Sequence, residues 1–179
     1  MTARLTIVLA QLRQRVGDLI GNADTMLARR AEAAAMGADL IAFPEMQLIG
    51  YPAEDLIEKP ALAERAATQL ARMAAATADA GPAMLVGTLH KDEAGVLYNA
   101  YALLEGGRVA DIRLKHELPN YGTFDEKRYF RPGPLPEPID FRGAKIGIPI
   151  CEDVWWPHVC AHLKDRGADF FIVPNGSPY

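Results

Sequence analysis

Short apolar runs alternate with helical stretches in the first half of the chain, and this alternation limits the fold more than any other feature. The runs Leu5–Leu12 and Leu40–Phe43 are short and dense in apolar residues, which predicts buried strands. Between them, apolar residues recur at helical spacing from Ala23 to Met36, with Asn22 as the expected N-cap and Gly37 as the C-terminal cap. The pattern predicts a β-α-β unit.

The rest of the chain predicts a second helix, a hairpin and more strands. A helix should run from Pro60, a residue tolerated in a first turn, to Asp79. The turn sequence Glu105–Arg108 between two apolar runs predicts a β-hairpin, so the sheet should be mixed. The other expected elements are the strands Ala83–Leu89, Asn99–Leu104, Val109–Leu114, Ile139–Phe141, Lys145–Ile150 and Phe170–Val173, and the helix Pro157–Arg166 followed by Gly167. Together they indicate one α/β domain.

Two segments stand outside this pattern. Residues His116–Pro138 are rich in proline, glycine, aromatic and charged residues, and loops of this length in compact domains usually carry function. The last predicted strand is followed by only a few residues, up to Tyr179, and no closing helix. We therefore expect a domain that is incomplete at its C-terminus.

Composition favours a small-molecule substrate. The net charge is -4 and no run of Lys or Arg exceeds a pair, which argues against binding to nucleic acid or to an anionic membrane. No stretch resembles a signal peptide or is long enough to span a bilayer. The two cysteines, Cys151 and Cys160, form no disulfide framework, which fits a reducing cytoplasm.

Three reactive side chains, Glu45, Lys115 and Cys151, each lie just beyond a predicted strand, where α/β sheets place their ligands. Singly, each has a simpler explanation, because free cysteine is often a buried apolar residue and charged residues commonly end strands in solvent. Jointly they form a workable amidase. The glutamate could carry the thiol proton to the leaving amine, while the lysine and a backbone N–H stabilise the oxyanion.

Other chemistries find less support. None of the four histidines, His90, His116, His158 and His162, lies in a recognisable cysteine-protease signature. A metal site at His158, Cys160 and His162 fails because alternate residues of a helix point to different sides. The sequence has no glycine-rich phosphate-binding motif. We therefore expect neither a metal nor a nucleotide cofactor in this chain.

The three residues resemble the Glu-Lys-Cys triad of the nitrilase superfamily in order and spacing. The matching motifs are Phe43-Pro44-Glu45, Lys115 ahead of Leu118-Pro119, and Ile150-Cys151-Glu152-Asp153-Val154-Trp155. Within that superfamily, Lys115–Phe130 is similar to the loop of the glutaminase domains of glutamine-dependent NAD synthetases, and Asn175–Tyr179 resembles their post-strand motif. The resemblance implies a nitrilase-type α-β-β-α sandwich with mixed β-sheets, C-terminally truncated, in which residues 1–179 form the glutaminase domain.

The resemblance also implies roles for individual residues. Cys151 would be the nucleophile, Glu45 the general base, Lys115 the oxyanion partner and Glu126 a supporting glutamate. The residues expected to contact glutamine are Tyr121, Glu152 and Ser177. Ammonia released from glutamine would amidate deamido-NAD on a C-terminal synthetase domain that binds ATP and magnesium and is absent from this sequence. By analogy with the family, the protein would form a homo-oligomer.

Two alternatives remain. A free-standing amidase of the same superfamily would share the triad but need not carry the loop pattern of Tyr121–Phe130. An inactive fragment is the other alternative, because missing strands and helices would leave part of the pocket open.

Overall fold

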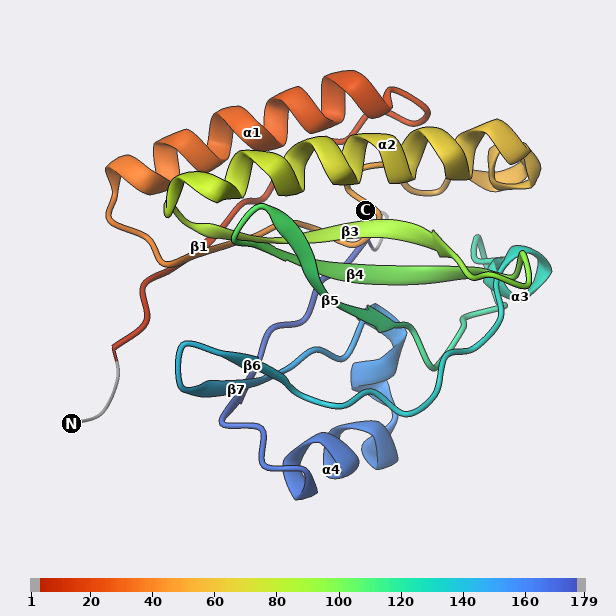
Figure 1. Ribbon diagram of the computed structural model, residues 1–179. Coiled ribbons are helices and arrows are strands. Elements are labelled where there is room, and N and C mark those ends of the chain that lie inside the picture. The colour runs from red at the N-terminus through yellow and green to blue at the C-terminus, as the bar shows by residue number, and fades with distance from the viewer. Residues whose placement is uncertain (1–3, 177–179) are drawn as a thin grey trace.

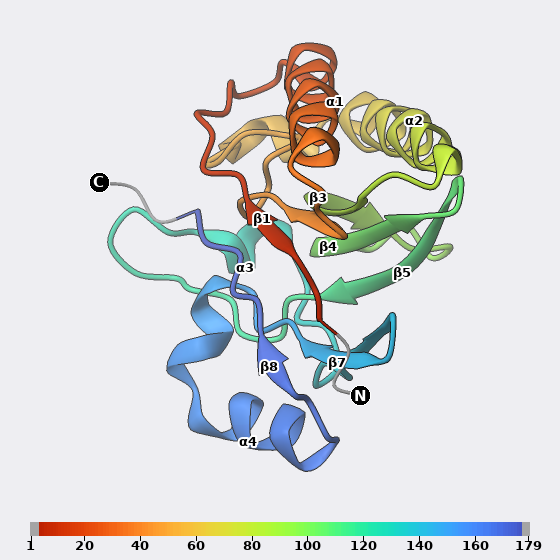
Figure 2. The ribbon, with the colours of Figure 1, turned by 90° about the vertical axis from the view of Figure 1, so that its left-hand side faces the viewer.

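A computed structural model describes residues 4–176 and shows two β-sheets packed between helices (Figure 1). Helices α1 (Leu19–Ala35) and α2 (Pro60–Ala76) cover one face of the larger sheet. The smaller sheet lies on its other face, and α4 (Pro157–Asp165) lies outside that smaller sheet (Figure 2). The predicted α-β-β-α architecture is confirmed.

The larger sheet has the strand order β1-β2-β3-β4-β5. The bounds are β1 Ile7–Leu9, β2 Leu40–Ala42, β3 Ala83–Lys91, β4 Leu97–Glu105 and β5 Arg108–Leu114. The first three strands pair in parallel, as β-α-β connections require, whereas β3-β4-β5 is an antiparallel meander. The predicted mixed sheet and its hairpin are both confirmed.

The smaller sheet has the order β6-β7-β8, with β6 Ile139–Phe141, β7 Ala144–Gly147 and β8 Phe170–Phe171. Strands β6 and β7 are antiparallel, and β7 and β8 are parallel. The remaining short helices are η1 Glu54–Glu58, η2 Thr77–Asp79, α3 Glu126–Tyr129 and η3 Cys151–Trp155. Helix α3 lies within the segment His116–Pro138, which was predicted to be a loop.

Strand β3 explains why the larger sheet reads as continuous apolar sequence. Met84 and Val86 face the helices, while Ala83 and Leu85 face the smaller sheet. Side chains of a strand alternate between its two faces, and both faces are covered here, so the run Ala83–Val86 is apolar throughout. Two cores result, one beneath α1 and α2 and one between the sheets.

Two local predictions were wrong. The N-cap of α1 is Asp18, whose Oδ1 accepts a hydrogen bond from the Gly21 N–H at 3.0 Å. Asn22 instead lies buried inside the helix, where its side-chain amide donates to the Leu48 carbonyl at 3.1 Å. Strand β7 ends at Gly147, so Cys151 does not follow a strand directly but begins η3.

Within residues 4–176, no helix is both long and apolar enough to cross a membrane.

Candidate active site

A buried ion cluster lies where strands of the larger sheet end. Lys115 follows β5 and is fully buried, with Nζ 2.7 Å from Glu45 Oε1 and 2.8 Å from Glu126 Oε1. Glu45 follows β2, and Glu126 is the first residue of α3. Charges buried this deeply persist only when each is paired and hydrogen-bonded. The structure thus brings three of the predicted residues together.

Two carboxylates share one ammonium in this cluster. Burial is the largest influence on Lys115 and lowers its pKa, but the charges of Glu45 and Glu126 together raise that pKa above the ordinary value. Lys115 therefore stays charged. Burial raises the pKa of Glu126, and the charge of Glu45 adds to that rise against the opposing pull of Lys115.

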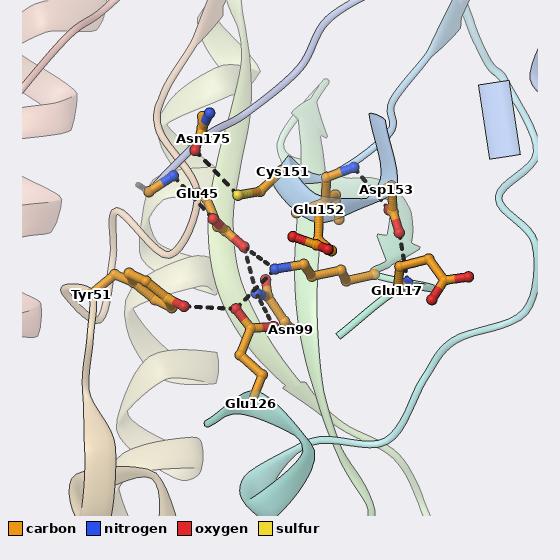
Figure 3. Close-up of polar contacts among 12 residues, drawn as sticks. Glu45, Tyr51, Asn99, Glu117, Glu126, Cys151, Glu152, Asp153 and Asn175 are labelled. Carbon is orange, nitrogen blue, oxygen red and sulfur yellow. Dashed lines mark hydrogen bonds and ion pairs between the residues drawn. The ribbon is translucent and has the colours of Figure 1, made fainter. Parts of the chain in front are cut away.

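Neutral donors fix the direction of both carboxylates (Figure 3). The Asn99 side-chain amide donates to Glu45 Oε1 at 2.8 Å, and the Gly176 N–H donates to Glu45 Oε2 at 3.0 Å. The Tyr51 hydroxyl donates to Glu126 Oε1 at 2.9 Å. Each oxygen of Glu45 therefore faces a donor, as a carboxylate requires.

The turn that carries Glu45 lies directly on β3 at Gly87. A Cβ on Gly87 would stand 2.3 Å from the Pro44 carbonyl oxygen and 2.4 Å from the Met46 nitrogen. The Leu48 N–H also donates to the Gly87 carbonyl at 3.0 Å. Only glycine permits this approach, so the missing side chain at Gly87 sets the position of the Glu45 turn.

Cys151 is nearly buried, and its backbone φ is +49°, a region that residues other than glycine seldom adopt. The Cys151 N–H donates to the Pro174 carbonyl at 2.9 Å, and the thiol donates to Asn175 Oδ1 at 3.1 Å. Figure 3 shows its sulfur and the Glu45 carboxylate pointing into the same space. Strain of this kind persists where the surrounding structure holds it, often at functional sites.

The thiol of Cys151 is protonated at rest. Burial raises its pKa to about 12, and the charge of Glu45 adds to the rise, whereas Lys115 opposes it. A thiol in this state reacts as a nucleophile only when a base removes its proton during attack. Glu45 has the charge and the position to do so.

Asp153 joins the segments that carry Lys115 and Cys151. It is fully buried, and its Oδ1 accepts hydrogen bonds from the backbone N–H groups of His116, at 3.1 Å, and Glu117, at 2.7 Å. Its Oδ2 accepts from the Ile150 N–H at 2.9 Å. Burial raises the pKa of Asp153 to about 6, although the three N–H donors oppose the rise.

The residues expected to contact glutamine are placed only in part. The Tyr121 hydroxyl donates to Glu152 Oε2 at 2.7 Å, and Glu152 directly follows Cys151. Tyr121 is 58% exposed, which leaves its ring accessible to a ligand. Ser177 lies outside the described residues.

Sequence reasoning missed three contributors to the site: Asn99, Asp153 and Asn175. One signal was available, because Asn99 is a lone amide in an apolar strand, and a buried amide must find a hydrogen-bond partner. The identity of that partner depends on the fold.

The four-layer sandwich, in which the Glu45–Lys115 pair lies beside the thiol of Cys151, defines a nitrilase-type protein. The comparisons agree, because the family model described as carbon-nitrogen hydrolase matches residues 6–179. The chain belongs to the carbon-nitrogen hydrolase family.

Individual relatives are more similar to this chain than the family model alone indicates, and several are NAD synthetases. The glutamine-dependent NAD(+) synthetase of Rhodobacter capsulatus is 45% identical over 179 residues, which are 100% of this chain and 32% of that protein. The chain thus spans about a third of the length of such relatives. A structure of glutamine-dependent NAD+ synthetase from Acinetobacter baumannii in complex with adenosine diphosphate matches with a TM-score of 0.92 and 38% identity, covering 97% of this chain and 32% of that one.

An amidase structure matches as well. A mutant of the amidase from Nesterenkonia sp. AN1, which shows Michael addition of acrylamide at its active-site cysteine, matches with a TM-score of 0.82 and 26% identity. The match covers 96% of this chain and 67% of that one.

Proposed function

We propose that this chain is the glutaminase part of a glutamine-dependent NAD synthetase and that it releases ammonia from glutamine through a thioester on Cys151. The observation that carries the proposal is the buried Glu45–Lys115 pair beside a protonated thiol. The likeness to NAD synthetases over the whole chain supports glutamine as the amide.

The first half-reaction forms the thioester. Glu45 takes the proton of the Cys151 thiol as the sulfur attacks the side-chain carboxamide carbon of glutamine. The carbonyl oxygen becomes an oxyanion, which the Lys115 ammonium and the backbone N–H of Glu152 stabilise. The C–N bond then breaks, the leaving nitrogen takes the proton from Glu45, and ammonia departs.

The second half-reaction regenerates the enzyme. Glu45 removes a proton from water, and the hydroxide attacks the thioester carbon through a second oxyanion at the same donors. The C–S bond breaks, glutamate leaves, and the sulfur of Cys151 takes back the proton from Glu45. The high pKa of the thiol favours this last transfer.

Glu126 and Glu152 have supporting roles. Glu126 holds the Lys115 ammonium together with Glu45, so that the charge stays aimed at the reacting carbonyl. The carboxylate of Glu152, oriented by its hydrogen bond from Tyr121, would bind the α-amino group of glutamine. Ser177 would complete these contacts.

The released ammonia would amidate deamido-NAD on a synthetase domain, which would also bind ATP and magnesium. Residues 1–179 would then be the glutaminase domain of a cytoplasmic, oligomeric enzyme. These assignments rest on the NAD synthetases that the chain resembles, of which it spans about a third.

The test is the release of ammonia and glutamate from glutamine by the chain and by the Cys151→Ala variant. Cys160→Ala is the matched control, because Cys160 lies on α4 outside the ion cluster. We expect Cys151→Ala to lose at least ~10³-fold in kcat and the control to keep the parent rate. Glutamine turnover by Cys151→Ala would refute the mechanism. Turnover of simple aliphatic amides without turnover of glutamine would favour a free-standing amidase.

A further inference from the structure

Three side chains with metal-binding atoms converge beside the ion cluster. Glu117 Oε1 lies 3.3 Å from His158 Nε2 and 3.9 Å from His116 Nε2. One potential ligand atom from each residue lies within 4.8 Å of the other two. Figure 3 shows the Glu117 carboxylate pointing away from Glu45 and Glu126, so the group is separate from the proposed catalytic residues.

The hydrogen bonds of His116 leave its Nε2 available for a cation. His116 Nδ1 lies 2.7 Å from the Gly133 carbonyl oxygen, which can only accept, so Nδ1 carries the ring proton. In the neutral ring, Nε2 then presents a lone pair toward the carboxylate of Glu117. The Nε2 lone pair and the carboxylate are both acceptors, so a cation between them would satisfy both. A histidine whose other nitrogen donates to a carbonyl is the usual arrangement of a metal ligand.

The spacing suits a tetrahedral ion. Bonds of about 2.0–2.2 Å at tetrahedral angles place the ligand atoms roughly 3.3 Å apart. The Glu117–His158 pair already has this separation. His158 is half exposed in the first turn of α4, so its ring has room to rotate and close the wider gaps. Two imidazoles and one carboxylate favour zinc over calcium or magnesium, which prefer oxygen ligands.

We propose that His116, Glu117 and His158 form a site for Zn²⁺ or a similar divalent transition metal, with water as the fourth ligand. Sequence analysis predicted no metal here, because His116 and His158 meet only in the folded chain. His116 and Glu117 directly follow Lys115, and His158 lies shortly after Cys151. The metal would therefore connect the two segments that carry these residues. The proposal does not depend on the proposed function.

The test is zinc chloride binding by calorimetry to the full chain without an affinity tag, in a Cys151→Ala, Cys160→Ser background that removes both thiols. His158→Ala and Glu117→Gln are the test variants, and Glu117→Gln keeps the backbone N–H that Asp153 accepts. His162→Ala is the matched control, because His162 lies one turn further along α4 and contacts Glu137 instead.

We expect one zinc ion per chain in the thiol-free parent and in the His162→Ala control, with binding at least ~10-fold weaker in both test variants. Zinc should also raise the Tm of the parent and of the control, but not of the test variants. Zinc binding by His158→Ala and Glu117→Gln as tight as that of the parent, or no stoichiometric binding by the thiol-free parent, would overturn the proposal.

Discussion

Gly87→Ala should damage the proposed catalytic centre without touching a reactive side chain. The added Cβ would stand 2.3 Å from the Pro44 carbonyl oxygen, whereas ordinary contact begins at 3.4 Å. The obstructing atoms are backbone, so the Glu45 turn has to retreat by about 1 Å, a displacement that can lower kcat by ~10²-fold. Overpacking of this kind costs about 1–3 kcal/mol of folding free energy.

The assay pairs ammonia release from glutamine with thermal unfolding. Gly37→Ala is the control, because φ at Gly37 is +72°, where alanine is strained by about 1–2 kcal/mol, and nothing lies within 4 Å of its Cβ position. Both variants should melt a few degrees below the parent, but only Gly87→Ala should lose turnover. If the two variants kept equal kcat values, Gly87 would not position Glu45.

Three further predictions concern the buried groups. Lys115→Met should lower the free energy of unfolding in urea by about 3–5 kcal/mol, because it leaves two buried carboxylates without their cation. The pKa of Glu126 is raised, so this loss of stability should shrink as the pH falls and that carboxyl is protonated, whereas a pH-independent loss would contradict the reasoning. Tyr51→Phe should cost about 1–2 kcal/mol through the lost hydrogen bond to Glu126, and an unchanged free energy of unfolding would show that bond to be unimportant. Asp153→Asn should be less stable than the parent, and this difference in stability should narrow as the pH rises from about 4 to about 7. The folded-state pKa of Asp153 is raised from 3.8 to about 6, so the parent alone loses stability as this buried carboxyl ionises. A difference that widened over that range would refute the reasoning.

Apolar pattern predicted the elements of the fold well but not the ends of its strands. The run Lys145–Ile150 reads as one strand, yet pairing stops at Gly147. Within residues 4–176, no strand pairs with residues 148–150, while Ile148 and Ile150 remain buried in the core between the sheets. Apolar sequence reports burial, and a strand also needs a neighbouring backbone to pair with.

The proposed catalytic residues were accessible from sequence because each is a reactive side chain near a strand end. Their supporting residues were not, since an amide such as Asn99 has no chemistry of its own to single it out. Its role comes from the distance of 2.8 Å to Glu45, a residue far away in sequence. The same limit applied to His116 and His158, whose rings meet only after the segments that carry them have packed together.

The proposed site depends on how the two sheets pack. Glu45 and Lys115 follow strands of the larger sheet, whereas Cys151 follows the smaller one. Tyr101, fully buried between the sheets, donates from its hydroxyl to the Phe43 carbonyl at 2.6 Å, two residues before Glu45. Asp153 also connects the two sheets, because it accepts backbone hydrogen bonds from His116 and Glu117 after β5 and from Ile150 after β7. Relative movement of the sheets would therefore separate the thiol from its proposed base, so the core between them sets the geometry of the proposed reaction as well as the stability of the fold.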